Sequence, residues 1–122
     1  MVNPDANFYI AHVTAPSLAS ARDLADMALS KRLAACANLI PKVESRYWWD
    51  GKLCHAEEVL ILFKTTNVRL EALRLQVIQA HPYDTPEFVA IPIAQGDAAY
   101  LSWIAASTIE APSTATQATQ RK

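Results

Sequence analysis

The chain has 122 residues, a one-domain length, with 52% hydrophobic residues, two glycines and a formal net charge of −1. Its scattered lysines and arginines form no basic stripe, and no apolar run reaches the roughly 18 residues of a membrane span, which argues against nucleic-acid and membrane partners. A start without a basic and then apolar leader, together with only two cysteines, predicts a cytoplasmic protein.

The first segments predict a strand followed by a helix. Residues 8–14 are apolar and β-branched and stop before Ala15-Pro16, which indicates a buried strand. Ser17 stands where a helix N-cap is expected. The apolar residues after it recur with a period close to 3.6, so we expect a helix over residues 17–33.

A long hairpin follows. Residues 35–53 predict one long strand, or two strands separated at Pro41, and Asp50-Gly51 is typical of a tight hairpin turn. The return strand covers residues 53–65. Its second half is continuously apolar, which predicts burial on both faces, whereas its first half is polar enough to project beyond the core.

The second half of the chain predicts a helix, a strand and a shorter helix. Asn67 is expected to cap a helix over residues 68–80. Residues 88–94 form another apolar run and predict a fourth strand, and residues 98–107 predict a final helix. From residue 109 to 122 the sequence is rich in Ser, Thr, Gln and Ala, so we expect a disordered tail.

This order of elements is typical of one fold class. The pattern β-α-β-β-α-β, with an extra C-terminal helix, predicts an α+β, ferredoxin-like domain over residues 1–108. Two helices would cover one face of a four-stranded antiparallel sheet. The uncovered face would still carry aliphatic side chains, so we expect self-association to cover it.

Five segments, in this order, resemble a known family. They are LAACANLIP, YWWDGKL, EEVLILFKTT, HPYDTPE and GDAAYLSWIAAS. In these segments, which fall within residues 10–107, the chain resembles the CutA divalent-cation tolerance proteins. The resemblance implies a homotrimer, closed by pairing of the long hairpins, that responds to metal ions and is not an enzyme. The resemblance also implies that such a protein requires no cofactor.

The resemblance also implies a place for copper. In copper-binding relatives the ligands stand at positions held here by Val13, Ala80 and His81, so only His81 supplies a donor. We therefore expect at most weak binding of Cu²⁺ or another divalent metal, because tight sites need three or four converging donors.

The connector after the second predicted helix is the best candidate cleft. His81, Tyr83 and Glu87 place polar groups beside the end of an apolar strand, and Lys64 could bring an ammonium to the same place. Such a cleft would bind a small anion or a metal ion. The alternative is that Tyr83 and Glu87 fix the turn and that Lys64 caps a helix end.

Cysteines and tryptophans supply the remaining candidates. Cys36 is either a metal-binding thiol in an intersubunit cleft or a small buried hydrophobe. Cys54 and His55 could grip a soft metal, although neighbouring strand residues diverge. Trp103 either stacks on a ligand in the cleft or fills the core, as aromatic residues more often do.

Two functions remain open. One is a trimeric metal-tolerance protein with weak copper-type binding. The other is a signalling or assembly module like the PII proteins, which share the trimeric ferredoxin-like architecture and bind small molecules between subunits. An enzyme is disfavoured, because no Ser/His/Asp or Cys/His set and no glycine-rich loop can be placed in the sequence.

Overall fold

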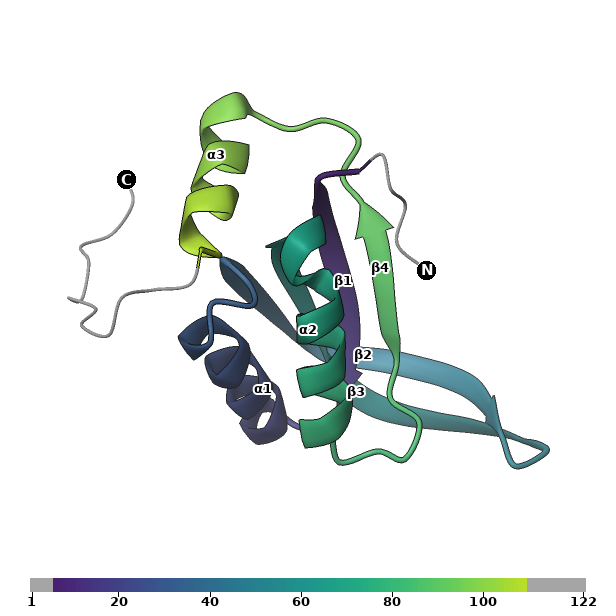
Figure 1. Ribbon diagram of the computed structural model, residues 1–122. Helices are drawn as coiled ribbons and strands as arrows, with labels where there is room; N and C mark the ends of the chain where they lie inside the picture. Colours follow the sequence, from purple (N-terminus) through teal and green to yellow (C-terminus); the bar gives the residue numbers. More distant parts are fainter. Residues whose placement is uncertain (1–5, 110–122) are drawn as a thin grey trace.

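A computed structural model describes residues 6–109 and confirms the α+β, ferredoxin-like prediction. The elements in chain order are β1 (Phe8–Ala15), α1 (Leu18–Ser30), β2 (Cys36–Trp49), β3 (Lys52–Thr66), α2 (Asn67–Ala80), β4 (Phe88–Pro92) and α3 (Ala98–Ser107). The sheet is antiparallel throughout, in the order β2-β3-β1-β4. Figure 1 shows α1 and α2 on one face of it, with α3 as the extra helix. Except for its first residue, 109, the predicted tail lies outside the described residues.

The first helix begins where predicted but ends earlier. The Ser17 hydroxyl accepts a 3.1 Å hydrogen bond from a backbone N–H of the first turn, which confirms it as the N-cap. The predicted end at residue 33 is wrong, because Arg32 adopts a left-handed conformation with φ 57°. The Leu33 N–H then donates to the Ala28 carbonyl at 2.9 Å, which closes the helix end.

The second helix starts one residue before its predicted start. Asn67 is its first residue rather than its cap, and Thr66 holds the cap position without a side-chain hydrogen bond. The prediction of an Asn67 cap is wrong because β3 runs directly into α2, and the Asn67 N–H donates instead to the Asn7 carbonyl at 2.9 Å. In α3 the Asp97 carboxylate does cap, accepting from two backbone N–H groups at 3.1 and 3.3 Å.

The hairpin strand β2 is continuous and carries a bulge. Pro41 and Lys42 together oppose the single residue Val59, because the pairing steps from Ile40 to Val43 across the bulge. Proline is tolerated there because β2 is an edge strand and the bulge needs no donor. The predicted Asp50-Gly51 turn is confirmed: its φ angles of 51° and 72° are those of a type I′ turn.

The core lies between the sheet and the two long helices. Fully or almost fully buried side chains include Ala11, Val13, Val59, Ile61, Phe63, Leu73 and Val77. On the open face, Leu60 and Leu62 are only half-buried. The prediction that this apolar run is buried on both faces is therefore wrong for residues 6–109 of a single chain, since α1 and α2 both lie on the other face (Figure 1).

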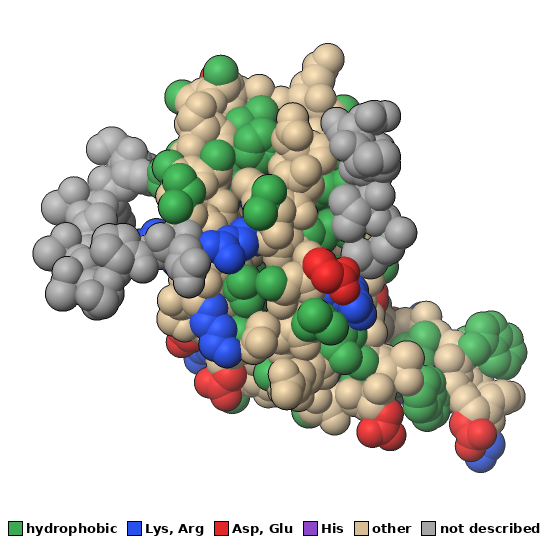
Figure 2. Space-filling model, viewed as in Figure 1, with side chains coloured by type: hydrophobic (Ala, Val, Ile, Leu, Met, Phe, Trp, Pro, Cys, Tyr) green, Lys and Arg blue, Asp and Glu red, His purple; other side chains and the backbone are tan. Residues whose placement is uncertain are grey.

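The hairpin extends well beyond the body of the sheet. β1 pairs with β3 only from residue 59 onward, so residues 52–58 of β3 have β2 as their one partner strand. Figure 1 shows this part as a projecting two-stranded arm, and Figure 2 shows apolar side chains gathered on it. Trp48, Trp49 and Leu53 are 73%, 55% and 67% exposed there. The predicted projection is confirmed.

Candidate functional site

A pocket of about 810 Å³ opens where the hairpin leaves the sheet. Its walls come from the end of β1, from both strands of the hairpin and from the connector between α2 and β4. The lining residues are Thr14, Ser45, Arg46, Tyr47, Trp49, Glu58, Pro82, Tyr83, Asp84, Thr85, Pro86 and Glu87. Of the predicted site residues, Tyr83 and Glu87 line this pocket directly.

His81 lies behind the pocket and is buried, with both ring nitrogens engaged. Its Nδ1 accepts a hydrogen bond from the Tyr83 backbone N–H at 3.1 Å, so the proton belongs on Nε2. Nε2 then donates to the Thr14 carbonyl at 2.7 Å. The histidine therefore holds the connector against the end of β1, and its ring also packs against that of Tyr83 at 4.9 Å.

Tyr83 joins this connector to the hairpin. Its hydroxyl donates a 2.9 Å hydrogen bond to the carboxylate of Glu58, which is buried at the point where the arm meets the sheet. Burial of the phenol, and then this bond and the negative charge of Glu58, raise the pKa of Tyr83 to about 12. The tyrosine therefore stays a neutral hydrogen-bond donor.

Glu87 lies on the opposite wall and faces the open side of the sheet. Its carboxylate accepts a 3.4 Å hydrogen bond from the Thr14 hydroxyl and lies 3.2 Å from Nε2 of His12. Val13, the residue at the family's cysteine position, points to the other face and is fully buried in the core. The metal-ligand positions implied by the resemblance therefore do not converge on the pocket.

The bulge in β2 decides which hairpin residues reach the pocket. Before the bulge the even-numbered residues share the open face, and after it the odd-numbered residues do, because one extra residue shifts the alternation. Tyr47 and Trp49 consequently lie on the same face as Thr14 and Glu58. They supply an aromatic wall to a pocket whose other lining residues include three carboxylates and two prolines.

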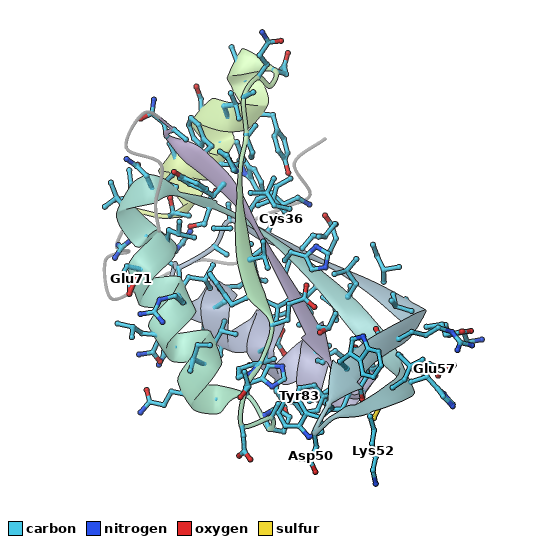
Figure 3. All side chains as sticks on the ribbon, turned by 90° about the vertical axis from the view of Figure 1, so that its right-hand side faces the viewer. Cys36, Asp50, Lys52, Glu57, Glu71 and Tyr83 are labelled. Atoms are coloured by element: carbon cyan, nitrogen blue, oxygen red, sulfur yellow. The ribbon has the colours of Figure 1, made fainter. Side chains whose placement is uncertain are left out.

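The other predicted cleft residues lie at the far end of the sheet. Lys64 and Cys36 pair with each other, and Lys64 also pairs with Ile10, four residues along β1 from Thr14, or roughly 13 Å. The Lys64 ammonium donates to the side-chain carbonyl of Asn38. The prediction that Lys64 shares a cleft with Glu87 is therefore wrong within one chain, because the strand register places Lys64 four residues along the sheet from Thr14, the partner of Glu87. Figure 3 shows Cys36 and Tyr83 at opposite ends.

The remaining candidates do not form a site by themselves. Cys36 and Cys54 are free and half-buried. Cys54 pairs with Tyr47 and His55 with Arg46, so the two point to opposite faces of the arm. Trp103 packs against Tyr100 on α3 at a ring distance of 5.5 Å. Within residues 6–109, no three His, Cys, Asp or Glu side chains come together as a metal site.

Several residues at this site have no predicted role in the cleft, among them Thr14, Glu58, Tyr47 and Trp49. The patterns place Thr14 in a strand and Glu58, Tyr47 and Trp49 in the hairpin. His12 is considered only as a substitute for the ligand missing at Val13, whereas it contacts Glu87. Glu58 does carry a usable signal: it is a carboxylate directly before an apolar run and in phase with the open face of that run. A charged residue that becomes buried at such a place indicates a polar partner, which here is Tyr83.

Comparison with known proteins gives one consistent result. The family model of the CutA1 divalent ion tolerance protein matches residues 9–107. A divalent-cation tolerance protein CutA from Yersinia pestis is 42% identical over 113 residues, covering 89% of this chain and 95% of that protein.

Solved structures agree with the sequence comparison. CutA1 from Oryza sativa superposes with a TM-score of 0.82 at 40% identity and covers 87% of this chain and 97% of that one. A protein from Archaeoglobus fulgidus, described as the periplasmic divalent cation tolerance protein CutA, gives a TM-score of 0.81 at 37% identity, covering 84% and 99%. Among the helices at residues 6–109, none is both long and apolar enough to cross a bilayer.

Proposed function

Since the chain belongs to the CutA1 divalent ion tolerance family, we propose that it serves tolerance of divalent metal ions as a non-enzymatic homotrimer with weak, copper-type metal binding. The observation that carries this proposal is the family match, which covers residues 9–107 and so nearly all of the described fold. The names of the relatives supply the physiological role. The arm and the surroundings of His81 support the assembly and the weak binding.

The arm supports the trimer. A two-stranded ribbon is marginal in water, and this one exposes Trp48 and Leu53 together with the free edge of β2. A second and a third copy of the chain would cover these groups and pair the edge. In sedimentation velocity at micromolar concentration we expect one species of three times 13.4 kDa. A folded single chain would overturn the assembly.

The geometry of His81 supports weak rather than tight metal binding. A copper ion at this ring would displace one of its two hydrogen bonds, and the described part of one chain supplies no third converging donor. The predicted ligand set therefore needs donors from more than one subunit or from water.

Calorimetry with Cu²⁺ tests this proposal. We expect weak binding that is lost in His81→Ala and kept in the control His55→Ala, whose imidazole is exposed on the arm. Because His81→Ala removes a buried side chain, circular dichroism must show that the variant is folded. The absence of copper binding below millimolar concentration in the unaltered protein would contradict the proposal.

A second candidate function is a PII-like module that binds a small molecule. The pocket at the base of the arm favours it, because its volume falls in the range of small-molecule sites, roughly 300–1,000 Å³. Thermal-shift screening of metabolites tests this candidate, since a ligand that binds only the folded state raises the melting temperature as its concentration rises.

We also propose a cytoplasmic location. The half-buried thiols of Cys36 and Cys54 are free, as is usual in a reducing compartment. Cell fractionation of the native host tests it, and recovery in a periplasmic or secreted fraction would contradict it.

A further inference from the structure

The pocket at the base of the arm has a chemistry that metal binding does not explain. Its volume of about 810 Å³ greatly exceeds what a bare ion fills. A metal site would also need converging donors, which residues 6–109 do not bring together. The dimensions instead fit an organic molecule.

The charges that line the pocket are mainly negative. Glu58, Asp84 and Glu87 contribute carboxyl groups, and Arg46 is the cation among the lining residues. The charge of the Arg46 guanidinium is offset by Glu44, to which its Nε donates at 2.8 Å. An anionic ligand would therefore meet repulsion that is largely uncompensated, whereas a cation would be attracted.

Two of the carboxylates are held in place by the protein. Glu58 accepts from the Tyr83 hydroxyl at 2.9 Å, and Glu87 accepts from the Thr14 hydroxyl at 3.4 Å and contacts His12 at 3.2 Å. A carboxylate offers about four acceptor positions, so each keeps free lone pairs. A ligand that donates hydrogen bonds would find these acceptors already oriented, which reduces the entropy lost on binding.

The aromatic wall adds a second attraction for the same kind of ligand. Tyr47 and Trp49 line the pocket and stay 41% and 55% exposed in a single chain. The face of an aromatic ring attracts ammonium groups, with Trp the strongest. Aromatic faces do not replace the oxygen or nitrogen ligands that a metal ion requires.

We infer that this pocket binds a small organic cation with a primary ammonium group, which donates to Glu58 or Glu87 while its alkyl chain packs on Tyr47 and Trp49. The inference rests on the second candidate function, the small-molecule module, and names its ligand class. It is independent of the proposed metal binding.

A charge series of similar length tests the ligand class. Calorimetry is carried out with putrescine, butanediol and succinate at physiological ionic strength, which screens non-specific attraction. We expect putrescine to bind at least about tenfold more tightly than butanediol, because hydrogen bonds to charged groups are the stronger ones. Succinate should give no heat of binding beyond that of dilution.

Paired variants locate the binding. Glu87→Gln should weaken putrescine binding about tenfold, and Glu71→Gln, which changes the net charge equally on the exposed face of α2, should leave it within about twofold. Trp49→Ala should weaken binding, and Trp48→Ala, on the opposite face of the arm, should not. Circular dichroism of each variant verifies folding.

Three outcomes would overturn the inference, each in a different way. Tighter binding of succinate would reverse the ligand class but keep the small-molecule function. Equal losses in Glu87→Gln and Glu71→Gln would reduce the effect to overall charge. Copper binding without any putrescine binding would leave the metal proposal standing and remove the ligand class. If the metabolite screen also finds no ligand, the small-molecule function is removed as well.

Discussion

The two halves of β3 form one continuous strand but lie in opposite environments. Residues 59–66 pair with β1, and most of them also with β2, and they alternate between the core and the open face. Residues 52–58 pair with β2 alone, and most of their side chains are exposed. The same secondary structure is therefore stabilised by core packing in one half, and by a turn and a single partner strand in the other.

This difference indicates where the chain is self-sufficient. The body half, residues 59–66, already has a core on its helix-covered side, because Ile61 and Phe63 are completely buried beneath the helices. The arm half, residues 52–58 with the facing part of β2, presents a free strand edge and large apolar side chains to water. Natural proteins avoid such exposure unless another chain covers it. Glu58 marks the boundary between the two halves.

Removing the arm should have the largest effect on the molecule. Deleting residues 45–48 together with residues 53–56 removes four facing pairs and keeps the Asp50-Gly51 turn in register. We expect the shortened chain to stay folded, because the core is untouched, but to lose the proposed trimer. Circular dichroism and sedimentation velocity measure the two properties separately. A shortened chain that still forms a trimer would show that the body half carries the assembly.

Among single substitutions, truncating a core residue of the body half should cost the most stability. Phe63→Ala is expected to lower the free energy of unfolding by about 3–5 kcal/mol, since the ring is fully buried. The control Val68→Ala, at an α2 residue that is 81% exposed, should change it by less than about 0.5 kcal/mol. Urea denaturation measures both. Equal effects would mean that the core is elsewhere.

The contrast between the two halves also explains what the sequence could predict. The element order, the Ser17 cap and the Asp50-Gly51 turn depend on residues close together in the chain, and the structure confirms them. The misplaced start of α2 shows the limit of this reasoning, since the turn into the helix is set by β3 and not by Asn67.

The candidate site is harder to predict because it depends on register. Tyr83 and Glu87 are neighbours in sequence and do share the pocket. Lys64 is predicted beside them, but pairing with β1 places it four residues away along the sheet. Which side of the arm faces the pocket depends on the bulge at Pro41, and no local pattern fixes a bulge.

At the tip of the arm, substitution of the turn glycine should have a moderate effect. Gly51 has φ 72°, and a Cβ added there would meet no atom within 4 Å, so Gly51→Ala would cost conformational energy only. We expect a loss of about 1 kcal/mol in unfolding free energy, against almost none for Lys52→Ala. Urea denaturation again provides the measurement. An unchanged stability would show that the arm opens independently of the body half.

The smallest expected effect concerns the junction, where Tyr83 ties the connector to Glu58. The pKa of Tyr83 is raised to about 12, first by burial and then by Glu58. Between about pH 10 and 12 the unfolded chain releases this proton while the folded chain keeps it, so folding stability falls as the pH rises through that window. Tyr83→Phe lacks the proton and should show a shallower decline in a series of urea denaturations.

Glu58→Gln separates the two causes of this shift. It removes the negative charge but leaves the partial desolvation of the phenol, so the pKa of Tyr83 should move part of the way back, which phenolate absorbance measures. An unaltered pKa in this variant would mean that desolvation alone holds the proton on the phenol. A decline in stability equally steep in Tyr83→Phe and in the parent protein would mean that the hydroxyl does not join the connector to the base of the arm. The boundary between the two halves of β3 would then rest on strand pairing alone.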